Sequence, residues 1–182
     1  MKEKKYIADK VTIYEDYIKP LNLTILSASP MAGAQTGLEF YREVKGYHKK
    51  GNLWAVSLEL DSNLQPFINL ASRRKNKISY QEFPILAYTM DYCIKNKIVL
   101  FASDPLQQQS FRKKSEMFDL WYKASWKNPT FCSEFILPVN KFEKIRAKET
   151  AERLRRLSPT SPWQIIHIAS RRQAKLLEKL LG

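Results

Sequence analysis

One short pattern in the sequence, Glu43-Val44-Lys45, is typical of metal-dependent nucleases. In such enzymes carboxylates hold Mg²⁺ near the scissile phosphate, and a lysine supports the attacking water. The site also needs an acid from a neighbouring strand, and Asp16 and Glu39 are the nearest candidates. A metal-dependent nuclease is therefore one functional alternative, although a Glu-x-Lys pattern is short and common by chance.

Histidine and cysteine do not form any other familiar reaction centre. The chain has two histidines, His48 and His167, and two cysteines, Cys93 and Cys132, without a Cys-x-x-Cys pair. This set predicts no zinc site. Neither a Walker-type phosphate loop nor a Gly-x-Gly-x-x-Gly motif is present. We therefore assign no metal ligands from the sequence.

Positive charge is the strongest functional signal. The 182 residues include 31 Lys and Arg against 18 Asp and Glu, which gives a formal net charge of +13. From residue 141 to the end, eleven basic and four acidic residues leave +7, more than half of the total. A surplus of this size is most easily tolerated beside a polyanion. We therefore expect a nucleic acid as partner, with no preference between DNA and RNA.

Basic residues interleaved with aromatic ones are the expected nucleic-acid contacts, because bases stack on rings while cations hold phosphates. The contacts assigned on this pattern are Arg42, Lys45, Lys49, Lys50, Lys113 and Lys114. The basic C-terminal helices add phosphate contacts at Lys144, Lys148, Arg155, Arg156, Arg171 and Arg172. The content of 44% hydrophobic and 12% aromatic residues indicates a folded core rather than disorder. With a polar N-terminus and no run of about 18 apolar residues, we expect a cytoplasmic protein without membrane insertion. Oligomeric state is not indicated.

Hydrophobic spacing predicts the elements that must position these residues. Alternation predicts strands over Leu38–Tyr47 and Leu53–Leu60, joined by a hairpin turn at His48–Gly51. The continuous apolar run Ile98–Ala102 predicts a strand buried on both faces. The remaining segments are expected to be a short helix at Asp9–Lys19 and strands at Leu21–Ala28 and Thr130–Leu137.

Capping patterns predict four later helices, starting near Ser79, Asp104, Asn140 and Ser161. We expect a core domain over 1–157 that ends with a helix at 141–157, a linker at 158–162 and a C-terminal helix at 163–182. The order predicts an α/β (or α+β) sandwich, with a mixed, mainly antiparallel sheet and helices on its faces. Parallel pairing is expected where Ile98–Ala102 enters the sheet.

Three strands followed by helix–strand–helix–strand, over about Leu21–Leu137, resemble the core of the GNAT acyltransferases. The resemblance implies an acyl-CoA cofactor whose pyrophosphate lies on the basic loop before a helix. The implied cofactor-binding residues are Arg73, Arg74, Lys75, Asn76, Lys77 and Ser79. This loop lacks the glycines usual in the family. The resemblance also implies Tyr122 as general acid, with Glu59 and Asp61 as bases acting through a water.

The sequence thus leaves three functional hypotheses. The first is a basic protein acting on nucleic acid, in the form of a GNAT-like acyltransferase that modifies a nucleic acid or an RNA-linked group. The second is a nucleic-acid-binding protein without catalytic activity. The third is the metal-dependent nuclease.

Overall fold

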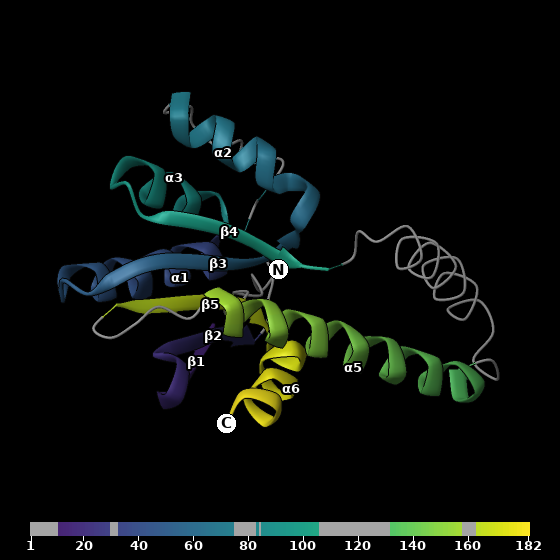
Figure 1. Cartoon of the computed structure of the whole chain (residues 1–182). Coiled ribbons are helices and arrows are strands. Elements are labelled where there is room, and N and C mark those ends of the chain that lie inside the picture. Colours follow the sequence, from purple (N-terminus) through teal and green to yellow (C-terminus); the bar gives the residue numbers. More distant parts are fainter. Residues whose placement is uncertain (1–10, 30–32, 75–82, 84, 106–131, 158–162) are drawn as a thin grey trace, which may run out of the picture.

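A computed structural model describes residues 11–29, 33–74, 83, 85–105, 132–157 and 163–182. These residues form one five-stranded sheet in the order β1-β2-β5-β3-β4 (Figure 1). The strands are β1 (Thr12–Ile18), β2 (Leu23–Ser29), β3 (Leu53–Asp61), β4 (Val99–Asp104) and β5 (Gln164–Ser170). Short 3₁₀ turns follow β1 (η1, Lys19–Leu21) and β3 (η2, Ser62–Leu64). The expectation of an α/β fold with a mixed sheet is confirmed.

The sheet is mainly parallel, so the expectation of a mainly antiparallel sheet is wrong. Only β1 and β2 pair antiparallel, whereas β2–β5, β5–β3 and β3–β4 are parallel. The predicted hairpin strand at 38–47 lies within helix α1 (Gly33–Lys49). Phe40, Val44 and Tyr47 are buried, and their spacing of four and three residues places them on one face of a helix. Tertiary burial of that face explains why the alternation failed as a strand signal.

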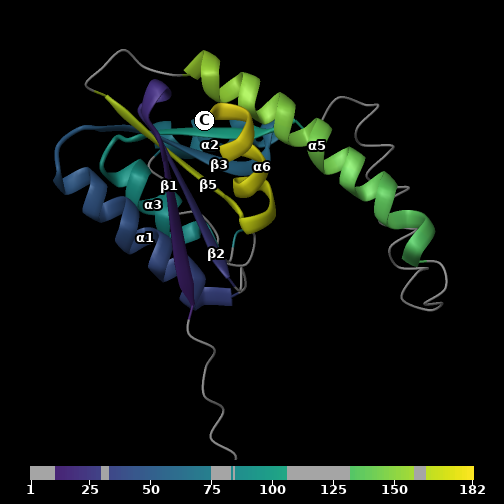
Figure 2. The same cartoon turned by 90° about the horizontal axis from the view of Figure 1, so that it is seen from below.

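Helices cover both faces of the sheet. On one face, α1 and α3 (Ala87–Lys95) pack over the larger core, to which α2 (Gln65–Arg74) adds Ile68 and Ala71 at the β4 edge. On the other face lie α5 (Cys132–Leu157) and α6 (Arg171–Leu181), over a second core. Figure 2 shows the two layers on either side of the strands and the first turns of α5 projecting beyond them. Among the described helices, none combines the length and apolarity needed to cross a membrane.

The C-terminal segment belongs to the centre of the sheet, so the expected helix over 163–182 is a further correction. Residues 164–170 form β5 between β2 and β3, and the helix begins only at Arg171. The run Ile165-Ile166-His167-Ile168 is fully buried. A short apolar run does not distinguish a buried strand from a buried helix by periodicity. Its β-branched residues favour the strand.

Some of the other predicted elements are confirmed and some are wrong. The strands expected at Leu21–Ala28, Leu53–Leu60 and Ile98–Ala102 are confirmed, as is parallel pairing of the last of these. The short helix expected at Asp9–Lys19 is instead β1, whose Thr, Ile and Tyr residues favour strands. From Cys132 onward, the strand expected at Thr130–Leu137 is part of α5. The helix starts at Ser79 and after Asp104 fall mainly outside the described residues.

On the outer edge of β4, the Gln65 side chain of α2 bonds to the strand backbone. The Gln65 amide donates from Nε2 to the Leu100 carbonyl at 2.9 Å, and its Oε1 accepts from the Ala102 N–H at 2.7 Å. A side-chain amide here replaces a neighbouring strand. Exposed edge groups otherwise invite pairing with another chain.

Candidate functional site at the carboxyl edge of the sheet

The carboxyl ends of β3, β4 and β5 meet at one edge of the sheet, where open α/β sheets commonly bind ligands. Glu59 lies near the end of β3, Asp104 ends β4 and Ser170 ends β5. In the ladder between β3 and β4, Asp61 lies opposite Asp104. The parallel topology therefore places acidic residues from distant parts of the sequence side by side.

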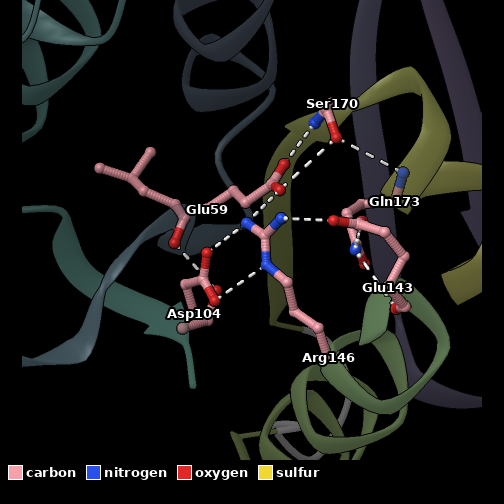
Figure 3. A network of polar contacts seen from close by, with 8 residues as sticks. Glu59, Asp104, Glu143, Arg146, Ser170 and Gln173 are labelled. Carbon is pink, nitrogen blue, oxygen red and sulfur yellow. Dashed lines mark hydrogen bonds and ion pairs between the residues drawn. The ribbon is translucent and has the colours of Figure 1, made fainter. Parts of the chain in front are cut away.

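Arg146 of α5 connects these acids (Figure 3). Its Nε donates to Asp104 Oδ1 at 3.0 Å, and its guanidinium also pairs with Asp104 Oδ2 and with Glu59. Glu143, one helical turn earlier, lies 3.6 Å from the same guanidinium. The side chains are only 3–17% exposed. One cation thus joins α5 to two adjacent strands.

The start of α6 completes the network. The Ser170 backbone N–H donates to Glu59, while the Ser170 hydroxyl accepts from the Gln173 N–H as the N-cap of α6. The Gln173 side chain in turn donates to Glu143. Such a cap satisfies one of the unpaired N–H groups at a helix start. The network therefore fixes α5 and α6 relative to each other and to the sheet.

Burial determines the electrostatics of this network. Burial raises the pKa of Glu59, and the Arg146 charge and the Ser170 hydrogen bond only partly offset this effect. Burial also opposes the charge on Arg146, but hydrogen bonding to Asp104 and the charges of Glu59, Asp104 and Glu143 keep its pKa above the ordinary value. In this geometry Glu59 is held by protein groups, and its role as a general base stays a prediction.

A second buried polar pair lies on the same face of the sheet. The His167 ring on β5 has Nδ1 3.1 Å from Ser57 Oγ on β3, and its Nε2 has no hydrogen-bond partner. Burial lowers the pKa of His167 to about 3. The ring is therefore neutral at physiological pH. Among the described residues, no three His, Cys, Asp or Glu side chains gather in a way that could hold a metal ion.

The Glu43-Val44-Lys45 pattern does not lie on a strand. Both Glu43 and Lys45 belong to α1, and residues two apart on a helix do not share a face. The proposed supporting acids have other partners: Asp16 pairs with Arg171, and Glu39 pairs with Arg42. The expected strand carrying Glu43 and Lys45 is therefore wrong, and nuclease activity stays a hypothesis.

The residues implied by the acyltransferase resemblance are only partly within the described chain. Arg73 and Arg74 are exposed at the end of α2. The others, Lys75, Asn76, Lys77, Ser79 and Tyr122, lie outside the described residues, as do the nucleic-acid candidates Lys113 and Lys114. Because 38–47 is helical, the observed element order differs from the one that carried the resemblance. Acyl-CoA binding stays a prediction.

The remaining nucleic-acid candidates fall on opposite faces of the sheet. On α1, Arg42 pairs with Glu39 at 2.6 Å, Lys45 lies over the Tyr41 ring and Lys50 lies over the Tyr47 ring. These cations are engaged within their own helix and its turn. Lys49, on the same helix, is exposed.

On the other face, exposed cations line α5 and α6. Lys144, Lys148 and Arg155 share one stripe of α5, because eleven residues make about three turns. On α6, Arg172, Lys175 and Lys179 follow at intervals of three and four residues. We call the exposed residues Lys144, Lys148, Arg155, Arg156, Arg172, Lys175 and Lys179 the α5–α6 basic surface. Within it, Arg155 also donates to the Leu180 carbonyl of α6. Arg171 is excluded, because it pairs with Asp16 and stacks on Tyr14 at 3.9 Å.

A hollow of about 300 Å³ lies beside the last turns of α5. Phe101 of β4 lines it together with Arg153 and Arg156. The Phe101 ring also packs against Trp54, with centroids 5.8 Å apart. Phe101 and two arginine side chains thus line one hollow near the C-terminal end of α5.

Sequence reasoning predicted neither the Arg146 network nor the hollow beside α5. Asp104 was interpreted as a helix start, and nothing in the spacing of Arg146 relates it to Glu59, 87 residues earlier. A run of apolar residues ending in an acid, as in Val99–Asp104, was the one available signal, because parallel strands end at a common edge. Comparisons with protein-family models, curated proteins and solved structures found no match.

Proposed function

We propose that this chain binds nucleic acid through the α5–α6 basic surface. The observation that carries the proposal is the charge exposed there. On residues 143–157 of α5 and on α6, seven exposed basic side chains stand against two exposed acids, Glu152 and Glu178. Cations gathered in this way attract phosphates and release their counterions.

The neighbouring hollow favours single-stranded nucleic acid. Bases of a single strand are free to stack on an aromatic ring, which contributes about 1–3 kcal/mol per base. Phe101 offers such a ring, and Arg153 and Arg156 beside it supply cations for the adjacent phosphates. A duplex buries its bases and would use only the phosphate contacts. We therefore infer tighter binding to a single strand than to a duplex of equal length.

The test compares two sets of four substitutions to glutamine. The first set is Lys144, Lys148, Lys175 and Lys179 on the α5–α6 basic surface; the matched set is Arg42, Lys45, Lys49 and Lys50 on α1 and the turn that follows it, in the opposite layer. Both sets remove the same formal charge. Binding of a fluorescent oligothymidylate is measured by anisotropy at fixed ionic strength.

We expect the first set to weaken binding by about tenfold or more, as lost phosphate contacts imply. The matched set should change the Kd by no more than about threefold, through the long-range field only. Equal losses in both sets would show that net charge, and not this surface, governs the interaction. A Phe101→Leu variant should reduce the difference in Kd between a single strand and a duplex of equal length.

A further inference from the structure

A second cavity, of about 960 Å³, lies at the opposite end of β4 from the acidic cluster. It opens between α2, the end of α3 and the first residues of β4, which lie together at the edge of the sheet in Figure 1. Its volume is within the range of small-ligand pockets, about 300–1,000 Å³. None of the residues of the α5–α6 basic surface lines it.

The lining combines an apolar floor with a cationic rim. Aliphatic residues form the floor: Ile94 near the end of α3, Ile98 after that helix, and Val99 and Leu100 at the start of β4. Val99 is 40% exposed, and the other three are largely buried. Among the described lining residues, three cations, Arg73, Lys95 and Lys97, stand against one acid, Asp91, so this part of the lining carries a surplus of two positive charges. Such a site is complementary to a ligand that has an anionic group at one end and a flat apolar body.

Lys97 occupies a backbone position that favours glycine. Its φ is +59°, in the left-handed region. The Ile98 N–H bonds to the Cys93 carbonyl and the Lys97 N–H to the Ile94 carbonyl, which is the hydrogen-bond pattern of a glycine-type helix end. A lysine there reduces local stability while it adds a cation to the cavity lining.

The polar groups on α2 fit a heterocycle next to the phosphate. Asn69 and Ser72 line the cavity beside Arg73. The Asn69 Oδ1 accepts from Gln65 Nε2 at 2.9 Å, which orients the amide. With Oδ1 so engaged, its Nδ2 can donate to an acceptor on a base edge.

We infer that this cavity binds a nucleoside monophosphate. Its phosphate would lie among Arg73, Lys95 and Lys97, and its base would pack on Val99 and the neighbouring aliphatic side chains. The site is independent of the surface proposed for the nucleic-acid strand, since it lies on different elements.

Calorimetric titration of the full chain with AMP, GMP, CMP and UMP tests the inference. Inorganic phosphate and the matching nucleosides are the two control ligands. We expect at least one nucleotide to bind about tenfold or more tightly than either of its parts, because both the charge and the apolar body contribute. Nucleoside binding equal to nucleotide binding, phosphate binding equal to nucleotide binding, or no nucleotide binding at millimolar concentration would each overturn the inference.

In the Lys97→Gly variant, a loss of nucleotide affinity could not be attributed to destabilisation of the fold. Glycine suits the left-handed backbone, so the thermal midpoint should rise by about 2–4 °C, while nucleotide affinity should fall by about tenfold. A second variant, Val99→Glu, places an acid on the floor and should also weaken binding. Unchanged nucleotide affinity in both variants would contradict the site.

Oligothymidylate binding separates this inference from the proposed function. Lys97→Gly should keep the Kd for the strand within about threefold. The four substitutions on the α5–α6 basic surface should likewise keep the nucleotide affinity. Loss of both ligands in the same variant would contradict the independence of the two sites.

Discussion

Arg146 is the residue on which the carboxyl edge depends. Its guanidinium pairs with Glu59, Asp104 and Glu143, all largely buried. Removing one partner of a buried ion pair leaves charges without compensation and costs about 3–5 kcal/mol. Replacing the whole cluster by well-packed apolar residues would cost much less stability, because a buried ion pair is not in itself strongly stabilising.

Arg146→Met is therefore expected to lower the free energy of unfolding by about 3–5 kcal/mol in urea titrations. Arg153→Met, on the same helix and partly exposed, is the matched control and should change it by about 0.5 kcal/mol or less. Equal free energies of unfolding for the two variants would contradict the claim that Arg146 stabilises the carboxyl edge.

His167 predicts how stability depends on pH. Its pKa is about 3 in the folded protein and 6.5 in a solvated histidine. Between these values the unfolded chain binds one more proton than the folded chain, so stability falls as the pH falls below 6.5. This histidine should contribute a slope of about 1.4 kcal/mol per pH unit.

A His167→Leu variant should lose that slope, measured by urea unfolding from pH 7 to pH 5. Its stability at pH 7 should also drop, because the Ser57 hydroxyl loses its hydrogen-bond partner. A His48→Gln variant, which keeps the buried histidine, is the reference for the slope. An unchanged slope in His167→Leu would mean that the ring is accessible to protons in the folded state.

At the scale of elements, Gln65 of α2 occupies backbone hydrogen-bonding groups on the outer edge of β4. Its amide makes two hydrogen bonds to the strand, each with a net worth of about 0.5–1.5 kcal/mol. Gln65→Leu should therefore cost about 1–3 kcal/mol and expose backbone groups that can pair with another copy.

Urea unfolding and light scattering measure the two effects. Gln35→Leu is the control, because the exposed Gln35 bonds to Glu39 within its own helix, and it should change stability by about 0.5 kcal/mol or less. If the Gln65→Leu protein were as stable and as monodisperse as the Gln35→Leu protein, the Gln65 hydrogen bonds would neither stabilise β4 nor prevent its pairing with another copy.

The elements also show what sequence could and could not predict. Alternation predicts β3, a continuous apolar run predicts β4, and a weaker pattern indicates β2. The segment 38–47 was mistaken for a strand, since Leu38, Phe40 and Val44 fit alternation as well as a helical face. Burial of the α1 face against the sheet and α3 decided between them, and that contact is not local in sequence.

For the whole molecule, the position of β5 is the main consequence of the topology. Two strands that precede it by more than a hundred residues flank it in the sheet. The site could not be predicted for the same reason: Glu59, Asp104 and Ser170 are neighbours only once β5 lies beside β3. Glu59 was correctly placed at a strand end, but its partners follow from strand order, which local patterns do not determine.

Truncation after Leu157 tests this topology. Loss of β5 and α6 removes the central strand and exposes both cores, so the shortened chain should not unfold cooperatively. Circular dichroism during heating would measure this. A truncated chain with a sharp transition would mean that the segment is an appendage, as the sequence had suggested.

The salt dependence of strand binding tests the central claim most directly. For oligothymidylate, log K against log[salt] should fall with a slope of about −0.7 per phosphate neutralised. Replacing Lys144, Lys148, Lys175 and Lys179 by glutamine should make that slope shallower by about 2 to 3, while the matched set on α1 and its turn leaves it nearly unchanged. Equal slopes for the wild type and the α5–α6 variant would contradict nucleic-acid binding at this surface.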